Sequence, residues 1–350
     1  MRGTLWGNVD PLLSVVMVTW NGLHHLRRSL PALLGQSLPP EASFEILVVD
    51  NASTDGSRRY LEELAAREPR VRLLVNARNE GFAGPNNRGF AAARGRFVAT
   101  LNNDTLPEPS WLAAMLDAAE AGERVGSVAS KMVFAHDPGT IQSAGISLDR
   151  TGIAWDRLVG RPVGESERVP VEVFGASAGA ALYRRDMLEE LGGFDSRFFM
   201  YLEDVDLAWR ARLAGWRAVY APGAVVRHAH SASAKEGSPL KNWHLGRNKV
   251  WSIAKCYPSP GLQSYLPLIV AYDLGSLPYT MVTKRDLSPL LGRLAGLRGL
   301  RPVLAERGRL HRRYPQGWER TAAWMEGVKP PAAVFQRYQS LRRIVERKGG

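Results

Sequence analysis

The sequence predicts an α/β protein built on an open, mainly parallel sheet with helices on its faces. Through the first 130 residues, short apolar runs rich in β-branched residues alternate with stretches of helical spacing, which is the pattern of strands joined by crossover helices. The runs are apolar throughout rather than alternating, as expected for strands buried on both faces. Polar residues directly follow several runs, where ligands bind in such sheets.

The elements follow one another in the order that this architecture requires. The expected strands are 13–19, 44–49, 71–75, 97–101 and 125–129. The expected helices between them are 23–36, a segment ending near 67, 85–94 and 109–121. Ser53 or Thr54 is expected to cap the second of these helices, because both residue types are favoured at that position.

Beyond residue 131 the pattern is looser. Residues 134–172 are glycine-rich with scattered charges and are interpreted as a long loop over one face, of the kind that acts as a lid or binding segment. Regular structure is expected again at 173–183, with a short helix at 184–192, a helix at 207–215 and strands at 216–220 and 224–226.

Composition limits the class of protein. The chain has 350 residues, of which 45% are hydrophobic and 23% charged, as in globular proteins. A single cysteine, Cys256, excludes an internal disulfide framework and fits a reducing compartment. The first eleven residues contain one arginine and no long apolar segment, so we do not expect a secretory signal. A cytoplasmic location follows as an expectation.

The basic charge is concentrated at the C-terminal end, and we expect two regions, 1–255 and 256–350. The second carries 16 Lys and Arg against 6 Asp and Glu, while the whole chain has a net charge of +12. The apolar stretch 262–282 contains Pro267, Asp273 and Pro278 and is not expected to span a membrane. The segment 287–313 mixes leucine with arginine and is predicted to be a basic amphipathic helix on an anionic membrane surface. Nucleic acid is not an expected partner, because aromatic residues for base stacking are not interleaved there.

Two acidic clusters are the main candidates for chemistry. Asn102-Asn103-Asp104 ends an apolar strand, where an aspartate suits Mg²⁺ that completes its shell with substrate phosphates. A simple turn aspartate is the alternative interpretation. Glu203-Asp204-Val205-Asp206 opens a helix next to aromatic residues. Such an apolar setting raises the pKa of a carboxyl group towards that of a general base, although acids at a helix N-terminus are also common without any catalytic role.

Other polar residues are weaker candidates. Asp50 follows the second strand and is interpreted either as a ligand of a nucleobase or ribose, or as part of an Asx turn. His228 and His230 follow a strand-like run and suit a metal or phosphate contact. A basic set, comprising Lys241, Arg247, Asn248 and Lys255, is interpreted either as a solvated face or as a diphosphate-binding group.

Taken in order, these segments resemble glycosyltransferase family 2, with its GT-A fold, in the bacterial rhamnosyltransferase-like branch. The resemblance covers roughly residues 12–255. The segments that carry it are SVVMVTWN at 14–21, VVDNASTDGS at 48–57, NEGFAG at 79–84, LNND at 101–104, GGFD at 192–195 and FMYLEDVDL at 199–207. No Q-x-x-R-W follows the second acidic cluster, which argues against a processive polymer synthase.

The resemblance implies a role for each matching residue. Asp204, with Glu203 beside it, would be the catalytic base, and Asp104 with His228 would hold Mg²⁺ or Mn²⁺ and the diphosphate. The nucleotide sugar would be bound by Thr19, Asn21, Asp50, Asn79, Gly84, Asn87, Asn102, Asn103 and Arg247. Asn102 stands where the D-x-D motif of the family has its first aspartate, which implies weaker metal binding or more reliance on His228.

The implied activity is inverting, metal-dependent transfer of a sugar from a nucleoside-diphosphate sugar to a hydroxyl of a glycan or lipid-linked acceptor. Cell-surface polysaccharide synthesis is the expected context, on the inner face of the plasma membrane, and a homo-oligomer is an open possibility. One alternative is a nucleotidyltransferase, although residues 16–23 lack a glycine-rich phosphate loop. The other is a non-catalytic, basic membrane-binding protein.

Overall fold

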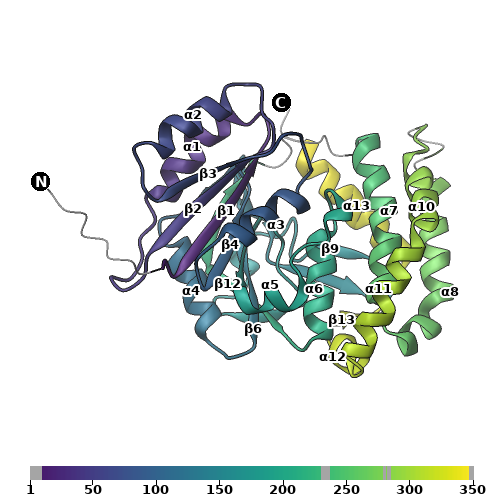
Figure 1. Cartoon of the computed structure of the whole chain (residues 1–350). Helices are drawn as coiled ribbons and strands as arrows, with labels where there is room; N and C mark the ends of the chain where they lie inside the picture. The colour runs from purple at the N-terminus through teal and green to yellow at the C-terminus, as the bar shows by residue number, and fades with distance from the viewer. Residues whose placement is uncertain (1–9, 230–236, 279–280, 282–284, 347–350) are drawn as a thin grey trace, which may run out of the picture.

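The structure, a computed structural model, describes residues 10–229, 237–278, 281 and 285–346. One large twisted sheet forms the centre, with its strands in the order β10-β12-β6-β11-β4-β1-β2-β3. Helices cover its faces, and a group of helices from the C-terminal part lies beyond one edge of the sheet region (Figure 1). The predicted α/β architecture is therefore confirmed.

The first half of the chain alternates strands and helices. Its elements are β1 (Leu13–Thr19), α1 (Leu23–Leu34), β2 (Phe44–Asp50), α2 (Ser57–Ala65), β3 (Val71–Val75), α3 (Ala83–Ala92), β4 (Phe97–Leu101), β5 (Thr105–Pro107), α4 (Trp111–Glu120) and β6 (Val125–Phe134). Strand β1 pairs in parallel with β2 and with β4, and β2 pairs in parallel with β3. The register places Thr19 beside Asp50, so the carboxyl ends of these strands meet at one edge of the sheet.

The second half continues the sheet and then adds helices. Its elements are β7 (Asp137–Ser143), β8 (Ile146–Asp149), β9 (Ala154–Asp156), the 3₁₀ helix η1 (Val163–Glu165), β10 (Val171–Val173), β11 (Ala180–Arg184), α5 (Arg185–Leu191), the 3₁₀ helix η2 (Ser196–Phe198), α6 (Glu203–Leu213), β12 (Arg217–His228), α7 (Pro239–Cys256), α8 (Ser259–Gly275), α10 (Ser288–Arg298), α11 (Leu300–Arg313), α12 (Gly317–Ala322), β13 (Met325–Glu326) and α13 (Pro331–Glu346). Strand β11 is antiparallel to both β4 and β6, so the sheet is mixed.

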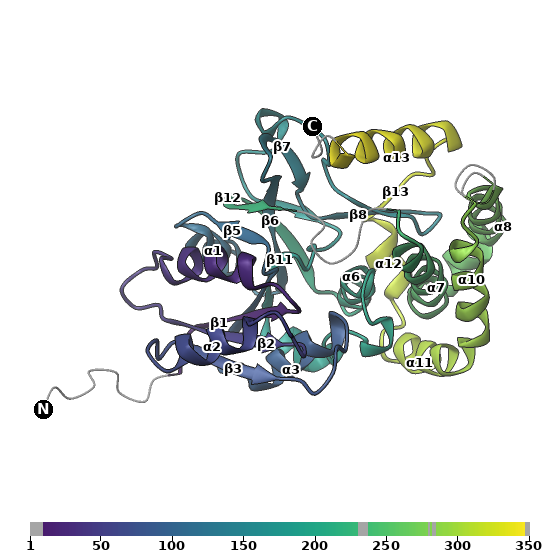
Figure 2. The same cartoon turned by 90° about the horizontal axis from the view of Figure 1, so that it is seen from above.

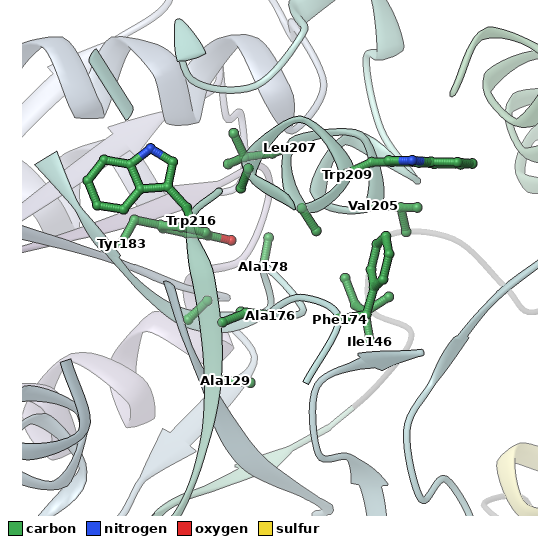
Figure 3. Close-up of a cluster of buried hydrophobic side chains, with 14 of the residues drawn as sticks. Ala129, Ile146, Phe174, Ala176, Ala178, Tyr183, Val205, Leu207, Trp209 and Trp216 are labelled. Atoms are coloured by element: carbon green, nitrogen blue, oxygen red, sulfur yellow. The ribbon is translucent and has the colours of Figure 1, made fainter. Parts of the chain in front are cut away.

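A buried apolar cluster fixes helix α6 against the sheet. Val205, Leu207 and Trp209 project from α6 and gather with side chains of the segment before β11, including Ala178 (Figure 3). Phe174 packs edge-on against Trp209, with ring centroids 6.3 Å apart. Because apolar interiors are close-packed, this cluster holds the first turn of α6, which carries the second acidic cluster, in a defined place.

The predicted cap of helix α2 is wrong. The helix begins at Ser57 after Gly56, which has a φ of 89°. Ser53 instead accepts a hydrogen bond from the backbone N–H of Asn21 at 2.9 Å, and the N–H of Thr54 donates to the Asn21 side chain at 2.7 Å. These residues join the loop after β2 to the loop after β1, an association that local capping preferences do not predict.

The interpretation of residues 134–172 as a long loop is also wrong. Strand β6 continues to Phe134, and β7 folds back against it. Strands β8 and β9 form a separate small sheet with β13, and the two strands predicted at 216–220 and 224–226 are one strand, β12, with an irregularity between Ala221 and Val225. Short strands among glycines and charges carry little periodicity, which explains the error.

The C-terminal helices stack outward from α6. Figure 2 shows α6, α7 and α10 in succession, moving away from the sheet. The predicted single helix at 287–313 is wrong, because the chain breaks at Gly299 into α10 and α11, where a Cβ would lie 2.8 Å from the Trp251 ring. Strand β13 pairs with β8, so the chain after residue 255 returns to the body that precedes it. The division into regions 1–255 and 256–350 stays a prediction.

Within the described ranges, none of the helices is both long and apolar enough to cross a bilayer. The stretch predicted not to span, 262–282, falls mainly in α8, and residues 279, 280 and 282 lie outside the described part of the chain. His230, the second histidine of the predicted pair, lies outside it as well.

Candidate active site

Strand ends and the start of α6 enclose a cavity of about 550 Å³. Several predicted site residues line it: Asn79, Asn102, Asn103, Asp104, Glu203, Asp204 and His228. Asp104 and Asp204, which are distant in the chain, therefore face the same space. Asp50, the third acid expected there, does not line the cavity, although it lies at the same edge of the sheet.

Asp104 and His228 form one pair in the cavity wall. His228 Nε2 lies 3.1 Å from Asp104 Oδ1, and His228 Nδ1 lies 2.9 Å from Gln142 Oε1. The last residues of β12 pair with β5, opposing His228 to Thr105, which directly follows Asp104. Burial alone would raise the pKa of Asp104, but the neighbouring His228 and His25 outweigh it and lower the pKa to about 2. Asp104 is therefore ionised at neutral pH.

This pair fits a divalent cation that is also held by substrate. A carboxylate oxygen and an imidazole nitrogen adjoin each other, and the amide side chains of Asn102 and Asn103 line the same cavity. Across the part of the chain that the structure describes, no group of three or more His, Cys, Asp and Glu is placed to hold a metal. Such a sparse donor set suits Mg²⁺ or Mn²⁺ completed by diphosphate oxygens rather than an all-protein site.

Glu203 and Asp204 differ although they are adjacent. Glu203 is 5% exposed and its Oε2 has no hydrogen-bond partner, so burial, followed by the charge of Asp204, raises its pKa well above the usual range. Asp204 accepts hydrogen bonds from the N–H groups of Ala178 at 3.1 Å and Val205 at 2.8 Å. Burial raises its pKa to about 6 against these bonds. With a pKa of about 6, Asp204 is mostly ionised near neutral pH.

The end of β2 carries a buried polar pair, Asp50 and Asn51. Asp50 is fully buried; its Oδ1 accepts from Ser53 N–H at 3.2 Å and its Oδ2 has no partner. Asn51 lines the cavity and donates to Asn79 Oδ1 at 2.8 Å. The hydroxyl of Thr19 accepts from the Asn103 amide at 2.9 Å. Thr19 therefore supports the cavity wall from behind it through Asn103.

Four other predicted binding residues lie outside the cavity lining, and their contacts with a donor stay a prediction. Asn21 joins two loops, as described above, and Gly84 lies within the first turn of α3. The Asn87 amide donates to the Phe194 carbonyl at 2.6 Å and to Ser196. Arg247 donates to the carbonyls of residues 197 and 198 and lies between two tryptophan rings. The side chains of Asn21, Asn87 and Arg247 each join segments of the protein.

The basic set that includes Arg247 is not a solvated face. Lys255 is fully buried, with Nζ 2.7 Å from Asp195 Oδ2 and 2.7 Å from Asp206 Oδ1. Asn248 is fully buried as well. Only Lys241 of this set lines the cavity. A helix with polar residues on several faces looks exposed in the sequence, whereas its burial here depends on partners from remote segments.

Sequence reasoning missed several residues that line the cavity, among them Asn51, Gln142, Asp156 and Ser177. Asn51 directly follows Asp50 within the matching segment 48–57, so its position was a usable signal. Gln142 and Asp156 belong to the stretch interpreted as a loop, where no motif marks them.

The family model for Glycosyl transferase family 2 matches residues 14–192. This range contains the ends of β1, β2 and β4, together with Asp104, while Asp204 and His228 lie beyond it.

Curated relatives extend the match. The chain is 35% identical over 257 residues to an N-acetylglucosaminyl-diphospho-decaprenol L-rhamnosyltransferase of Mycobacterium tuberculosis, covering 67% of this chain and 81% of that one. It is 32% identical over 243 residues to the O-antigen biosynthesis protein RfbC of Myxococcus xanthus, of which it covers 18%. It also covers 26% of a protein from Sinorhizobium fredii to which it is 30% identical. The chain thus spans most of one relative and a minor part of the other two.

Solved structures agree on the fold. A mannosyltransferase of Pyrobaculum calidifontis, in complex with GDP-Man and Mn²⁺, has a TM-score of 0.52 at 20% identity and covers 95% of this chain and 81% of its own. GalNAc-T7 with UDP, GalNAc and Mn²⁺ has a TM-score of 0.61 at 17% identity, covering 89% of this chain and 59% of its own. With the family match and the mycobacterial relative, these show that the chain is a GT-A-fold glycosyltransferase belonging to glycosyltransferase family 2, in its bacterial rhamnosyltransferase-like branch.

Proposed function

We propose that this glycosyltransferase moves a sugar, with inversion at the anomeric carbon, from a nucleoside-diphosphate sugar to a hydroxyl of a lipid-linked glycan during cell-surface polysaccharide synthesis. The observation that carries the proposal is that Asp104 beside His228, and Asp204 on α6, face one cavity. The mycobacterial relative, named for a diphospho-decaprenol-linked acceptor, supports the choice of a lipid-linked acceptor.

Asp204 is the proposed base. Its carboxylate takes the proton of the acceptor hydroxyl as that oxygen attacks the anomeric carbon, and the bond from that carbon to the diphosphate oxygen breaks with the electron pair leaving on the diphosphate. A pKa of about 6 leaves Asp204 ionised near neutral pH yet basic enough to accept a proton, which is the balance that general bases need. Glu203 is assigned no proton transfer, because burial and the charge of Asp204 raise its pKa and so favour its protonated form.

Asn79, Asn102 and Asn103 are the proposed contacts of the donor, with Thr19 supporting Asn103. Asp104 and His228 would hold Mg²⁺ or Mn²⁺, which when bound supplies positive charge beside the leaving diphosphate. With Asn102 replacing a second carboxylate, we expect weaker metal affinity than a two-aspartate motif gives.

The test is a donor screen with product analysis. Purified protein is incubated with a panel of nucleoside-diphosphate sugars, with Mg²⁺, Mn²⁺ or EDTA, and with a synthetic polyprenyl-diphosphate glycan. We expect metal-dependent release of a nucleoside diphosphate and an inverted anomeric configuration by NMR. Asp204→Asn should abolish transfer while donor binding persists, and Asp117→Asn, an exposed aspartate of α4, is the matched control.

Three outcomes would contradict the proposal. Release of pyrophosphate would favour a nucleotidyltransferase. Retention of configuration would exclude direct attack of the acceptor oxygen from the face opposite the diphosphate. Normal turnover by Asp204→Asn would exclude Asp204 as the base.

The membrane face of the proposal rests on helix α10. Its small residues Gly292 and Gly296 are buried, and a Cβ on Gly292 would lie 2.1 Å from the Trp243 carbonyl oxygen of α7. At about 100° per residue, the opposite side of the helix carries Leu291 and Leu294, which are 52% and 40% exposed. The outward side of α10 is therefore apolar.

Helix α8 extends this surface. It contains one charged residue, Asp273, which pairs with Lys249 of α7 and Arg293 of α10. Val270 and Leu274 are exposed, the latter by 58%. With α8 and α10 joined by Asp273, their exposed apolar side chains lie on neighbouring helices (Figure 1).

An anionic lipid surface is the proposed occupant of this face. Residues 288–313 hold seven arginines against one glutamate, and exposed Arg298 and Arg301 follow the leucines of α10. This charge complements anionic headgroups and would repel a second copy of the same face. Apolar side chains that insert shallowly next to basic residues are the usual basis of peripheral membrane binding.

Vesicle flotation tests this part separately. We expect binding to phosphatidylglycerol-containing vesicles and little binding to pure phosphatidylcholine, with Leu291→Gln plus Leu294→Gln abolishing it. Val169→Gln, at a side chain that is 64% exposed elsewhere, is the control. Equal binding by the double variant, or a concentration-dependent dimer that it disrupts, would overturn the lipid assignment.

A further inference from the structure

The turn formed by residues 198–202 directly precedes helix α6, which carries the proposed base, and has an unusual backbone. Phe199, Tyr201 and Leu202 have φ values of 65°, 68° and 65°, in the left-handed region that non-glycine residues rarely adopt. The turn also lines the cavity beside Glu203 and Asp204. Such strained backbone persists only where surrounding contacts over-determine it, so those contacts identify what fixes the base in place.

Asn248 of α7 provides the most concentrated of these contacts. The two N–H groups of its Nδ2 are shared among three carbonyl oxygens of the turn, those of Phe198 at 3.1 Å, Met200 at 2.9 Å and Tyr201 at 2.7 Å. Asn248 is 0% exposed. The Phe198 carbonyl also accepts from Arg247, so the loss of the Asn248 amide would weaken chiefly the hold on the Met200 and Tyr201 carbonyls, and an unmade buried hydrogen bond is unfavourable.

Arg247 fixes which way the Asn248 amide points. Its Nε donates to Asn248 Oδ1 at 2.9 Å, which directs the Asn248 NH₂ group towards the turn. Its Nη2 donates to the carbonyls of Arg197 at 3.0 Å and Phe198 at 2.8 Å. The neighbouring rings of Trp243 and Trp251 lie 4.7 and 4.5 Å from the guanidinium carbon and immobilise it by cation–π contact.

The same turn also contacts the donor side of the cavity. The Phe199 carbonyl accepts from the N–H groups of Phe82 at 2.6 Å and Ala83 at 3.1 Å, at the start of α3. On its other side the turn runs into α6, whose Asp206 N–H donates to the Leu202 carbonyl at 2.9 Å. The turn thus connects the base-bearing helix to the donor-side loop, and Asn248 holds it from behind.

We propose that Asn248 is a positioning residue for sugar transfer: by holding three carbonyls of the 198–202 turn, it sets the place of the Asp204 carboxylate relative to the donor. This inference rests on the proposed role of Asp204. It assigns a catalytic consequence to a side chain of α7 that lies outside the cavity lining and touches neither substrate.

The test compares Asn248→Ala and Asn248→Asp with the matched control Lys249→Gln. The aspartate keeps the shape of Asn248 but removes the donating NH₂ group. Lys249 is the next residue of the same helix, and its Nζ bonds Asp273 at 3.0 Å, so this control loosens α7 without touching the turn. We expect kcat to fall roughly 100-fold in both Asn248 variants, as for a small displacement of a catalytic group, with donor KM within about threefold. Lys249→Gln should keep kcat within about twofold.

Two readouts keep the proposal falsifiable. Hydrogen exchange of peptides covering 80–84 and 198–206 should be faster in Asn248→Ala and unchanged in Lys249→Gln, whatever reaction the protein catalyses. If Asp204→Asn abolishes transfer but Asn248→Ala retains full kcat with native exchange, this inference fails and the proposed function stands. If Asp204→Asn is fully active, the assignment of the base fails first. A lowered kcat with native exchange in both segments would also overturn the positioning role.

Discussion

Two buried asparagines support the two sides of the cavity, and their partners differ. Asn51, 1% exposed, donates to Asn79 Oδ1 and to the Gly81 carbonyl, and accepts from the Asn76 amide and the Glu80 N–H. All of these partners belong to the loop after β3, the strand next to its own. Asn248 holds the 198–202 turn from a helix that follows it by about fifty residues.

We infer from this difference that the donor side of the cavity serves substrate binding and that the side carrying Asp204 serves the chemical step. The donor side of the cavity consists of neighbouring strand ends that support one another, so the positions of its residues are determined by the pairing of the strands. The acid side of the cavity comprises the 198–202 turn with Glu203 and Asp204, and it depends on α7. Because α7 also supports α10, the position of Asp204 depends on a helix that supports the proposed membrane face. We therefore expect changes on the donor side to affect KM and changes on the acid side to affect kcat.

After the loss of transfer expected for Asp204→Asn, Asp104→Asn should give the next largest effect, because Asp104 belongs to the donor side but acts in the chemistry. Loss of its charge should lower kcat/KM by roughly 100- to 1000-fold, the usual range for removing one group that stabilises developing charge. The metal dependence measured by titrating Mn²⁺ into the variant should shift to higher concentration. Asp117→Asn is the control. An unchanged metal titration in Asp104→Asn would mean that Asp104 does not bind the cation.

The pH dependence of activity tests the role of Asp204 as the base. Burial raises the pKa of Asp204 to about 6, and a base acts only when ionised. The value of kcat/KM, which reports the free enzyme, should therefore fall about tenfold for each unit below pH 6, reaching roughly 100-fold at pH 4 if the fold persists. A flat profile between pH 5 and 8, with chemistry shown to be rate-limiting, would contradict the assignment.

The same shift has a consequence for stability. A carboxyl group whose pKa is higher in the folded state binds its proton more tightly there, so its contribution favours the fold at low pH and is lost as the pH rises from about 4 to 6. Asp204→Asn should consequently raise the Tm at pH 7.5 relative to the original protein, and the gain should vanish near pH 4.

Asn51→Ala tests the donor side directly. It removes the shared partner of four groups around residues 76–81, so we expect donor KM to rise about tenfold, equal to about 1.4 kcal/mol, while kcat changes little. Steady-state kinetics with the donor as the varied substrate provides the measurement. If kcat fell and KM held, the two sides would not be separable in the way that we propose.

The sequence predicted the donor side better than the acid side for a physical reason. Strands β1, β3 and β4 were predicted with their observed bounds, because continuous apolar runs ending in polar residues mark buried parallel strands. Asn79, Asn102 and Asp104 follow such runs, so their arrival at one cavity follows from parallel pairing.

The acid side required information that local patterns do not contain. The raised pKa expected for an acid at the start of α6 agrees with that of Asp204, since aromatic neighbours were visible in the sequence. Arg247 was assigned to the donor, yet its guanidinium holds backbone carbonyls. A cation exposed to a diphosphate and one buried against carbonyls have the same sequence signature, and only packing between distant segments distinguishes them.

Gly81→Ala should give the smallest effect and tests the junction of the two sides. Gly81 has a φ of 79°, and a Cβ there would lie 2.3 Å from the Phe199 carbonyl oxygen. The methyl group must push the donor-side loop and the 198–202 turn apart, which we expect to lower the free energy of unfolding by about 1–3 kcal/mol. Both kcat and donor KM should then worsen by only about two- to fivefold, because each side retains its own asparagine. Gly164→Ala, where no heavy atom lies within 4 Å of the added carbon, is the control for chemical denaturation and kinetics. A change in KM alone would mean that the contact between Gly81 and Phe199 serves the donor loop and that the turn is fixed entirely by α7.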